Sequence, residues 1–417
     1  MGRSFHEQAK ACLRWNISHA GSKVNKMNEK RKALREKMLR ENAMIIQMLL
    51  VIAFIIIFAV INLVVPDRLY SQEENRTLAQ RPSASARNLA DGSFFSDLET
   101  CYSDQFVLRD KWVMLQANLA RLTGRRELNG VYIGKKKYLL AKPAEPDESQ
   151  IAGITDAINA FREAHEKLNT QVLMVPDAAS VLSDKLPEYA PLHDQVSDLL
   201  AFSQRLDPEI MWLDAVTPLL AHASEEIYYH TDHHWTSAGA KYVFDYIAHD
   251  MGIGSVVQEY DKYVVSDEFE GTLAAKTGLH RTKDVIEVYT PLGTDVEYYV
   301  SYPDTNEKST SMFHSEALDQ KDQYTVFFGG NHPLVEIHTT ADTTRSLMIF
   351  KDSYANSFVQ FLYPYYKNII LIDPRYYYDN AEALISTHGI TDVLILYSAD
   401  TAFEDTSLAD CLNAMRY

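Results

Sequence analysis

Cysteine is scarce in this sequence, and so are the motifs that build metal or redox sites. The chain has three cysteines in 417 residues, Cys12, Cys101 and Cys411, and no two are spaced as Cys-x-x-Cys. This excludes the usual cysteine-based zinc and iron–sulfur sites. Cys101 and Cys411 both follow the apolar segment described below. Whether they pair stays open, because spacing alone does not show that two cysteines meet.

Positive charge is scarce after residue 42. Residues 1–42 contain 11 Lys and Arg against 4 Asp and Glu, a net charge of +7. The remainder has 29 of the 40 basic and 53 of the 57 acidic residues, a net charge of −24. Because such an acidic region repels phosphate backbones, nucleic acid is excluded as its partner. The basic residues near the end of 1–42 are interpreted as neighbours of anionic lipid.

Charge is absent altogether between residues 43 and 65. This apolar segment is long enough to cross a hydrocarbon core of about 30 Å as a helix. Since basic residues stay on the cytoplasmic side, 1–42 is predicted to be a cytoplasmic tail and the acidic region to lie outside. An uncleaved anchor is favoured over a signal peptide, because the basic region is long and no small-residue cleavage site follows. The predicted localisation is therefore the cell membrane, with one span.

After the span, the pattern predicts a linker with helices over 66–128 and an α/β domain over 129–417. From Asp147 onward, helical periodicities alternate with short apolar runs such as "TQVLMVP". This alternation is typical of a parallel sheet sandwiched by helices. Residues from about 253 to 345 interrupt it with segments rich in Val, Tyr and Thr, which predicts an inserted region of β-strands and loops.

The stretch "KDSYANSF" places a serine where a nucleophile is useful. An apolar strand is predicted to end at Phe350, and a helix to begin shortly after Ser353. The carboxyl ends of strands form the ligand crevice of α/β sheets, and a helix start offers free N–H groups to an oxyanion. The alternative is that Asp352 or Ser353 simply caps the helix.

A serine needs a general base, and "YYHTDHHWTSAGA" offers one. Alternate residues of an extended loop project the same way, so Asp232 and His234 are expected to act together while His233 turns away. Asp232 would orient His234, which would take the proton of Ser353. Trp235 is expected to wall the pocket.

Two other interpretations of this loop remain. One is a metal site built from His230, Asp232, His233 and His234, which is disfavoured because adjacent residues rarely converge on one ion and no His-x-x-x-His helix is present. The other is a structural loop. We predict neither a metal nor a cofactor.

Further candidates lie near other predicted strand ends. Gly330 and Asn331 in "FFGGNHP" could complete an oxyanion hole or form an ordinary turn, and the N–H of Ser353 is the better first donor. Arg375, Tyr376 and Tyr377 follow the strand "NIILI" and are candidate substrate contacts. Lys351 is predicted either to contact substrate or to face solvent.

Together, these motifs resemble the DHHW family of bacterial membrane-anchored proteins. "DHHWTSAGA" matches its signature, and the supporting stretches are "SQEENRTLAQRP", "YSDQFVLRDKW", "FEGTLAAKTG", "FFGGNHP", "KDSYANSF" and "IDPRYYY". That family is a branch of the SGNH hydrolase-like proteins and is similar to the extracytoplasmic alginate O-acetylation enzymes. Their Asp-x-His-Trp motif falls here on Asp232, His234 and Trp235, and their serine on Ser353. The SGNH glycine and asparagine blocks match only loosely, at Gly330 and Asn331.

The resemblance implies a membrane-anchored O-acyltransferase, specifically an O-acetyltransferase, that modifies a polysaccharide outside the membrane. It also implies a membrane-bound O-acyltransferase partner that supplies the acyl group. A carbohydrate acetyl esterase with the same three residues is an alternative, and so is a non-catalytic polysaccharide-binding or assembly subunit.

Overall fold

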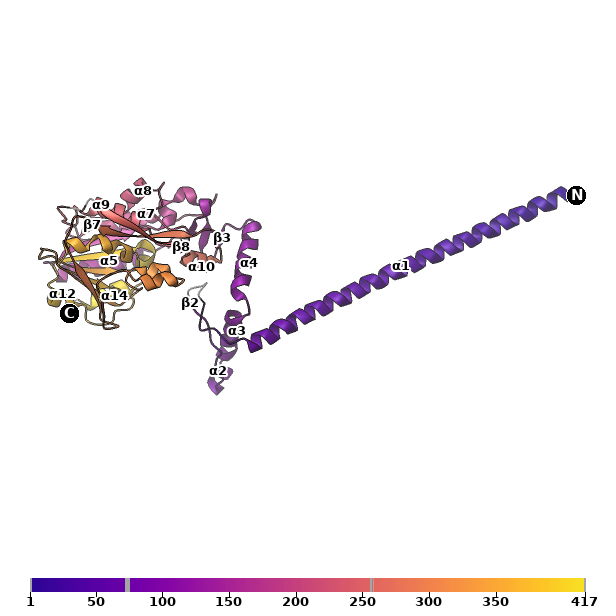
Figure 1. Cartoon of the computed structure of the whole chain (residues 1–417), viewed down its shortest axis with the longest axis horizontal. Coiled ribbons are helices and arrows are strands. Elements are labelled where there is room, and N and C mark those ends of the chain that lie inside the picture. The colour runs from indigo at the N-terminus through magenta and orange to yellow at the C-terminus, as the bar shows by residue number, and fades with distance from the viewer. Residues whose placement is uncertain (1, 72–75, 256, 258, 416–417) are drawn as a thin grey trace. The chain divides into compact units, whose positions relative to one another are not determined.

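The computed structural model describes residues 2–71, 76–255, 257 and 259–415. The chain divides into two compact units (Figure 1). The first comprises residues 1–69 and 78–109, and the second comprises 70–77 and 110–417.

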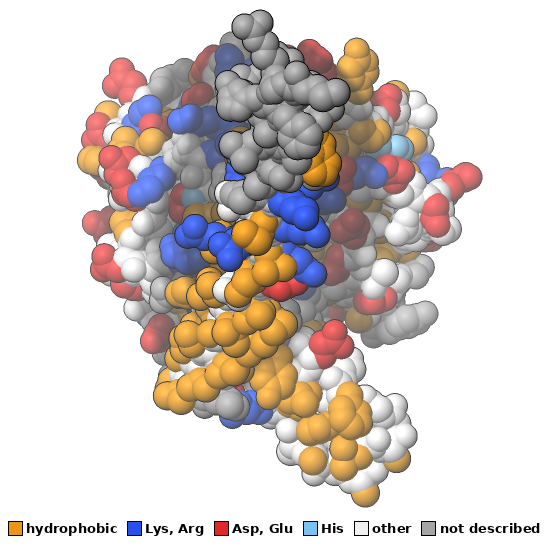
Figure 2. All heavy atoms as spheres, turned by 90° about the vertical axis from the view of Figure 1, so that its right-hand side faces the viewer, with side chains coloured by type: hydrophobic (Ala, Val, Ile, Leu, Met, Phe, Trp, Pro, Cys, Tyr) orange, Lys and Arg blue, Asp and Glu red, His pale blue; other side chains and the backbone are white. Residues whose placement is uncertain are grey.

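The first unit begins with one long helix, α1 (Gly2–Val64). Its stretch Asn25–Asn62 has a mean hydropathy of 3.2 and is long and apolar enough to cross a membrane, as an anchor or as a signal sequence. Figure 2 shows a band of Lys and Arg side chains on α1 beside a continuous apolar surface. The predicted segment 43–65 lies almost entirely within this helix.

Two short helices complete the first unit, α2 (Ala86–Ala90) and α3 (Ser93–Gln105). Side chains of α3 hold the residues that follow α1. The Gln105 amide donates to the carbonyl oxygen of Arg68 at 2.8 Å, and the Arg68 N–H donates back to Gln105 Oε1 at 2.8 Å. The Asp104 carboxylate accepts from the Ala79 N–H at 2.9 Å.

The second unit is built on an eight-stranded sheet with the order β11-β10-β12-β14-β13-β15-β6-β7. Five neighbouring strands are parallel: β14 (Asn368–Ile372), β13 (Ser346–Lys351), β15 (Asp392–Ser398), β6 (Asn169–Val175) and β7 (Met211–Leu213). Every residue of β13 and β15 is buried. This is why these strands read as continuous apolar runs in the sequence.

Helices cover both faces of the sheet, as predicted. On β6, Val172 and Met174 join one hydrophobic cluster, while Leu173 and Val175 join another, because alternate residues of a strand point to opposite faces. The first cluster contains buried side chains of α5 (Glu148–Ala164), α7 (Gln195–Arg205) and α14 (Ser407–Ala414), so these helices cover one face. The second contains buried side chains of α9 (Ser237–Ile247), which covers the other face.

The sheet differs from the prediction in being mixed rather than parallel throughout. The interrupting region supplies β10 (Tyr298–Tyr302), β11 (Glu307–Ser309) and β12 (Leu334–Thr339), and β12 pairs antiparallel with β14. The same region forms a separate antiparallel pair, β8 (Tyr260–Phe269) and β9 (Asp284–Pro291). The strands β10, β11 and β12 of the insertion therefore extend the main sheet, whereas β8 and β9 form a separate pair.

The remaining strands are β1 (Tyr70–Ser71), β2 (Arg76–Thr77), β3 (Glu127–Leu128), β4 (Val131–Ile133) and β5 (Leu139–Ala141). The remaining α-helices are α4 (Arg109–Leu122), α6 (Ala178–Val181), α8 (Val216–Ala221), α10 (Thr272–Thr277), α11 (Ala355–Phe358), α12 (Glu382–His388) and α13 (Ala399–Glu404).

Candidate active site

The candidate site lies at the carboxyl edge of the parallel strands. Ser353 follows the end of β13, Ser398 ends β15, Asp177 follows β6 and Asp373 follows β14. Since β14, β13, β15 and β6 are neighbours in this order, the loops after them lie side by side. This edge is where α/β sheets bind their ligands.

The structure brings Asp232, His234 and Ser353 into one hydrogen-bonded chain. Asp232 Oδ1 lies 2.5 Å from His234 Nδ1, and His234 Nε2 lies 2.7 Å from Ser353 Oγ. A carboxylate only accepts hydrogen bonds, so Nδ1 of His234 carries the proton and Nε2 accepts from the serine hydroxyl. This is the arrangement in which a histidine can remove the serine proton.

Asp232 is held in its ionised form. Burial raises the pKa of its carboxyl, but attraction to the imidazoles of His233 and His234 and hydrogen bonds from His234 and Thr272 outweigh burial. The pKa of Asp232 therefore lies well below its usual range. Its second oxygen, Oδ2, accepts from the N–H of Thr272 at 2.8 Å and from Thr272 Oγ1 at 2.9 Å.

Gly271 allows α10 to approach Asp232 this closely. A Cβ added at Gly271 would lie 2.3 Å from both Cβ and Oδ2 of Asp232. Only glycine leaves room for the carboxylate to reach the N–H of Thr272. This contact lies in the stretch "FEGTLAAKTG", from which the binding of Thr272 to the aspartate was not predicted. A glycine directly before a threonine was the available signal.

His233 bonds to Thr272, whereas His234 bonds to Ser353, and the His233 ring packs on His234. Its ring lies 3.9 Å from the ring of His234, and its Nδ1 lies 2.8 Å from Thr272 Oγ1. The Thr272 hydroxyl already donates to Asp232, so Nδ1 of His233 must be the donor and Nε2 keeps a lone pair. Desolvation lowers the pKa of His233 to about 4, which keeps it neutral at pH 7.

The metal interpretation rests on the same cluster. Ligand-type atoms of Asp232, His233 and His234 lie within 4.8 Å of one another. However, both oxygens of Asp232, both nitrogens of His234 and Nδ1 of His233 already have protein partners. An ion would have to break these bonds, so the donor set fits a hydrogen-bonded chain better than a metal site.

Asp352, not Ser353, caps the turn after β13. Its Oδ1 accepts from the Tyr354 N–H at 2.9 Å, and its Oδ2 accepts from the N–H and the hydroxyl of Ser398 at 2.9 and 2.7 Å. The hydroxyl of Ser353 is therefore left for His234. The N–H of Ser353 has no acceptor among the described residues, so it is available to an oxyanion.

Two aromatic residues support this turn. Trp235 is fully buried, and its indole N–H donates to the carbonyl oxygen of Tyr354 at 3.0 Å. The expectation that Trp235 walls the pocket is wrong, because its ring lies in the core, stacked on Phe358. Tyr324, which the sequence analysis missed, stacks on His234 at 3.9 Å and donates to the carbonyl oxygen of Ser353 at 3.1 Å.

Lys351 does not face solvent, which corrects that alternative. Its side chain is buried, and Nζ donates to Asn356 Oδ1 at 2.9 Å and lies 3.6 Å from Asp373 Oδ2. Burial lowers the pKa of Lys351, against the attraction of Asp373. The lysine therefore links the ends of β13 and β14.

The other candidates have mixed outcomes. Arg375 makes a two-pronged ion pair with Asp373, with Nε to Oδ1 at 2.8 Å and Nη2 to Oδ2 at 2.6 Å. Tyr376 is 48% exposed and lies under the Arg375 guanidinium. The N–H of Gly330 donates to the Phe327 carbonyl oxygen, and Asn331 is exposed, which favours an ordinary turn over an oxyanion hole.

The question whether the two outer cysteines pair, which the sequence left open, has a plain answer in the structure. Cys101 and Cys411 are both free thiols. Burial raises the pKa of Cys101 above its usual value and raises the pKa of Cys411 to about 11. Both thiols are therefore expected to be protonated and unreactive near neutral pH.

Comparison with known proteins supports the fold. Residues 131–331 match the family model of the SGNH hydrolase-like domain of the acetyltransferase AlgX. This range includes Asp232 and His234 and ends before Ser353. No curated protein matches the chain significantly.

Two solved structures resemble the chain over most of their own length. A DHHW family protein from Eubacterium siraeum is 25% identical, covers 68% of this chain and 95% of its own, and has a TM-score of 0.59. PatB1 of Bacillus cereus, solved also with a sulfonyl adduct, is 20% identical, covers 66% of this chain and 96% of its own, and has a TM-score of 0.56.

These matches confirm the resemblance drawn from the motifs. The second unit contains an SGNH hydrolase-like domain with a mixed sheet. The AlgX match also supports an enzyme, with a function of the O-acetyltransferase type.

Proposed function

We propose that the chain is a membrane-anchored, extracytoplasmic O-acetyltransferase that acetylates hydroxyl groups of a polysaccharide. The observation that carries the proposal is the hydrogen-bonded chain from Asp232 through His234 to Ser353. Support for acetyl transfer comes from the AlgX family match. Support for an anchor comes from the apolar part of α1.

In the first step, Ser353 takes the acetyl group. His234 Nε2 removes the hydroxyl proton as Oγ attacks the acetyl carbonyl carbon of an ester donor. The free N–H of Ser353 is placed to stabilise the resulting oxyanion. The ester bond of the donor then breaks, and its leaving oxygen takes the proton from His234. The product is an acetyl-serine enzyme.

In the second step, a sugar hydroxyl replaces the donor. His234 removes the hydroxyl proton, the sugar oxygen attacks the acetyl carbon, and Ser353 Oγ leaves and regains the proton. Asp232 stabilises the imidazolium in both steps, because it stays ionised beside Nδ1. If water takes the place of the sugar, the same residues make an acetyl esterase.

The acetyl donor must reach the outside of the membrane. Coenzyme A esters are cytoplasmic, so we infer a membrane-bound O-acyltransferase partner that passes the acetyl group outward. The basic residues 1–42 favour a cytoplasmic amino end, which would place the SGNH hydrolase-like domain on the receiving side.

The proposal is tested with the purified full chain in detergent and a chromogenic acetyl ester. We expect Ser353→Ala and His234→Ala each to lower the rate on the order of 10²–10⁴-fold or more. Ser386→Ala and His249→Ala are matched controls, because both side chains are exposed and lie outside the site.

Mass spectrometry separates the outcomes further. An acetyl group on the Ser353 peptide would support the acetyl-serine step, and acetylated oligosaccharide among the products would support transfer. Acetate as the sole product with every acceptor would favour the esterase. Activity that survives both substitutions would rule out Ser353 as the nucleophile.

A further inference from the structure

A cavity of about 200 Å³ lies beside the candidate triad and has no role in the two steps above. It opens over the ends of β15 and β6; β15 lies next to β13 in the sheet, and β6 lies next to β15. Its polar lining residues include Asp177, Lys276, Ser398, Asp400 and His233.

The cavity is continuous with the catalytic hydrogen bonds. Thr272 and His233 line it, and Thr272 also binds Asp232. On the other side Ser398 lines it, and the Ser398 hydroxyl donates to Asp352, directly before Ser353. Only one layer of side chains therefore separates the cavity from the reacting groups.

Its size suits a single small polar unit. Pockets for drug-sized ligands measure about 300–1,000 Å³, so this cavity is smaller than those. Its lining carries hydroxyls, carboxyls, an ammonium and the His233 imidazole but no Phe, Tyr or Trp side chain. Such a set forms hydrogen bonds with hydroxyl groups rather than stacking on a ring face.

Gln195 holds the two carboxyls of the cavity, Asp177 and Asp400, near each other. Burial and the neighbouring Asp400 carboxylate raise the pKa of Asp177 well above its usual range. The Gln195 amide nitrogen donates to Asp177 Oδ2 and also to Asp400 Oδ1, the latter at 3.3 Å. Lys276 is the cation on the rim. With a net charge of −24 on the region after residue 42, the cavity disfavours an anionic ligand.

We propose that this cavity binds one neutral sugar residue of the acceptor, whose hydroxyl donates to Nε2 of His233. The proposal rests on the proposed function and specifies its substrate as a neutral glycan rather than a uronate polymer. His233 is then a binding residue, and its position against His234 brings the acceptor to the acetyl-serine.

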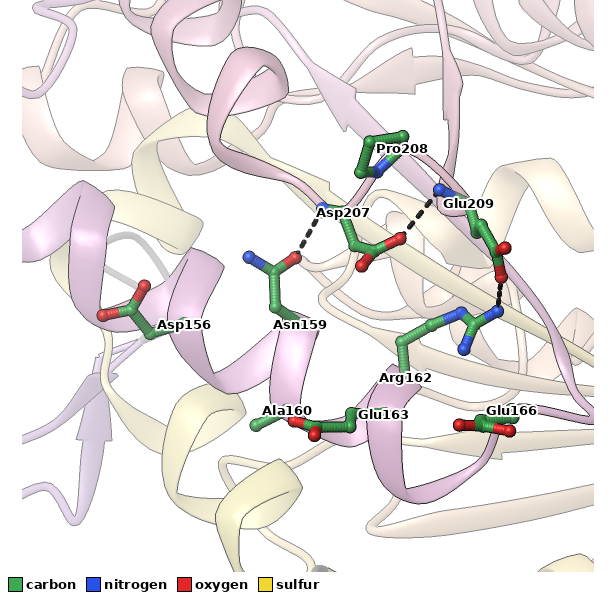
Figure 3. Close-up of a pocket in the computed structure, with 9 residues that line it drawn as sticks. All are labelled: Asp156, Asn159, Ala160, Arg162, Glu163, Glu166, Asp207, Pro208 and Glu209. Atoms are coloured by element: carbon green, nitrogen blue, oxygen red, sulfur yellow. Dashed lines mark hydrogen bonds and ion pairs between the residues drawn. The ribbon is translucent and has the colours of Figure 1, made fainter.

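A larger hollow of the described surface does not compete with this cavity. It measures about 980 Å³ and is lined by acidic side chains of α5 together with Asp207 and Glu209, as Figure 3 shows. Residues 207–209 precede β7, so this hollow lies at the amino edge of the sheet, away from Ser353.

The test measures how the acetyl-enzyme divides between sugar and water. The full chain is given a chromogenic acetyl ester with neutral tetrasaccharides of glucose, mannose, galactose or N-acetylglucosamine, or with glucuronate and mannuronate tetrasaccharides. Acetylated sugar and free acetate are counted. Their ratio is independent of how fast Ser353 is acetylated, so it reports on the acceptor alone.

We expect at least one neutral acceptor to exceed both uronates at least tenfold in this ratio. His233→Ala should lower the ratio at least tenfold, and His233→Gln, which offers an oxygen near the position of Nε2, should restore part of it. Asp400→Asn should lower the ratio for the neutral acceptor only. The control Asp156→Asn removes an exposed charge in the Figure 3 hollow and should change nothing.

Three outcomes overturn the proposal: transfer mainly to uronates, transfer to no neutral sugar, or a ratio unchanged in His233→Ala. If ester cleavage still depends on Ser353 and His234, these results reject the acceptor cavity alone. If ester cleavage is independent of both, the proposed function fails as well.

Discussion

At the residue scale, the chemistry depends on where each proton sits. Asp232 accepts hydrogen bonds at both oxygens, so it sets the tautomer of His234 directly and that of His233 through Thr272. One ionised carboxylate therefore sets the tautomers of two imidazoles, that of His234, which accepts from Ser353, and that of His233, which lines the neighbouring cavity.

Asp232→Asn tests this control of the tautomer. Asparagine has a similar shape but can donate a hydrogen bond, which lets His234 keep its proton on Nε2, where it cannot act as a base. We expect kcat/KM for the acetyl ester to fall on the order of 10³–10⁴-fold. Steady-state kinetics check the loss, and circular dichroism checks that the fold is kept. A loss below tenfold would contradict the role of Asp232.

Asp177 predicts a pH dependence of stability. Its pKa is raised in the folded chain, while an unfolded aspartate has a pKa of about 3.9. The folded state is therefore favoured below pH 4, and this contribution is lost as pH rises toward the folded pKa. Asp177→Asn cannot ionise. We expect its melting temperature to exceed that of the wild type by more at pH 8 than at pH 5; an equal difference at both pH values would argue against a buried, protonated Asp177.

The sequence could predict which residue types of the site react together, but it could not predict in which direction each side chain points. Asp232, His234 and Ser353 could be predicted because residue type and alternate spacing limit which side chains can react together. Lys351 and Trp235 could not be placed, because a loop position does not show whether a long side chain points inward. Lys351 was found in a buried ion pair, and Trp235 in the core.

At the scale of elements, the site depends on how closely α10 approaches the histidine loop. The N–H of Thr272, at the first residue of α10, reaches Asp232 only because Gly271 has no side chain. The loop and α10 come from distant parts of the sequence. The absence of a Cβ at Gly271 therefore allows the hydrogen bonds that join the loop to α10.

Gly271→Ala is expected to separate them. The new Cβ would overlap Asp232, so the carboxylate or α10 must shift, at a cost of about 1–3 kcal/mol and with loss of most ester cleavage. Gly153→Ala is the matched control. It lies in α5 with no heavy atom within 4 Å of the added Cβ, and should stabilise the chain by about 0.5–1 kcal/mol. Thermal melts and ester kinetics on both variants check the pair; equal effects would contradict the close approach.

The parallel strands could be predicted and their antiparallel extension could not. β13 and β15 are buried on both faces, and only such strands give continuous apolar runs. β10 is buried at alternate residues, with Val300 and Tyr302 inward. That pattern indicates a strand but not its partner, so nothing in the sequence showed that β12 would pair with β14.

At the scale of the whole molecule, charge separates the two ends of the chain. The +7 of residues 1–42 and the −24 of the remainder lie on opposite sides of the apolar segment. This asymmetry favours one orientation in a membrane, with the amino end inside.

A fusion of alkaline phosphatase to the carboxyl end tests this orientation. Phosphatase folds outside the cytoplasm, so we expect an active fusion in intact bacterial cells. Replacing the basic residues of 23–40 with glutamine should lower that activity, because the charge difference that sets orientation is reduced. An inactive fusion that is present in the membrane fraction would contradict the predicted orientation.

The Asp352 carboxylate determines when the loop that carries Ser353 becomes ordered. It ties the Ser353 turn to Ser398 at the end of β15, so the nucleophile's loop loses its freedom when the chain folds and not when a donor arrives. Fixing the backbone of one residue costs on the order of 1–2 kcal/mol. An acetyl group makes few contacts, so its binding energy could not offset the entropy lost in ordering a loop. Because the loop of Ser353 is already rigid, binding of the acetyl donor does not have to order it.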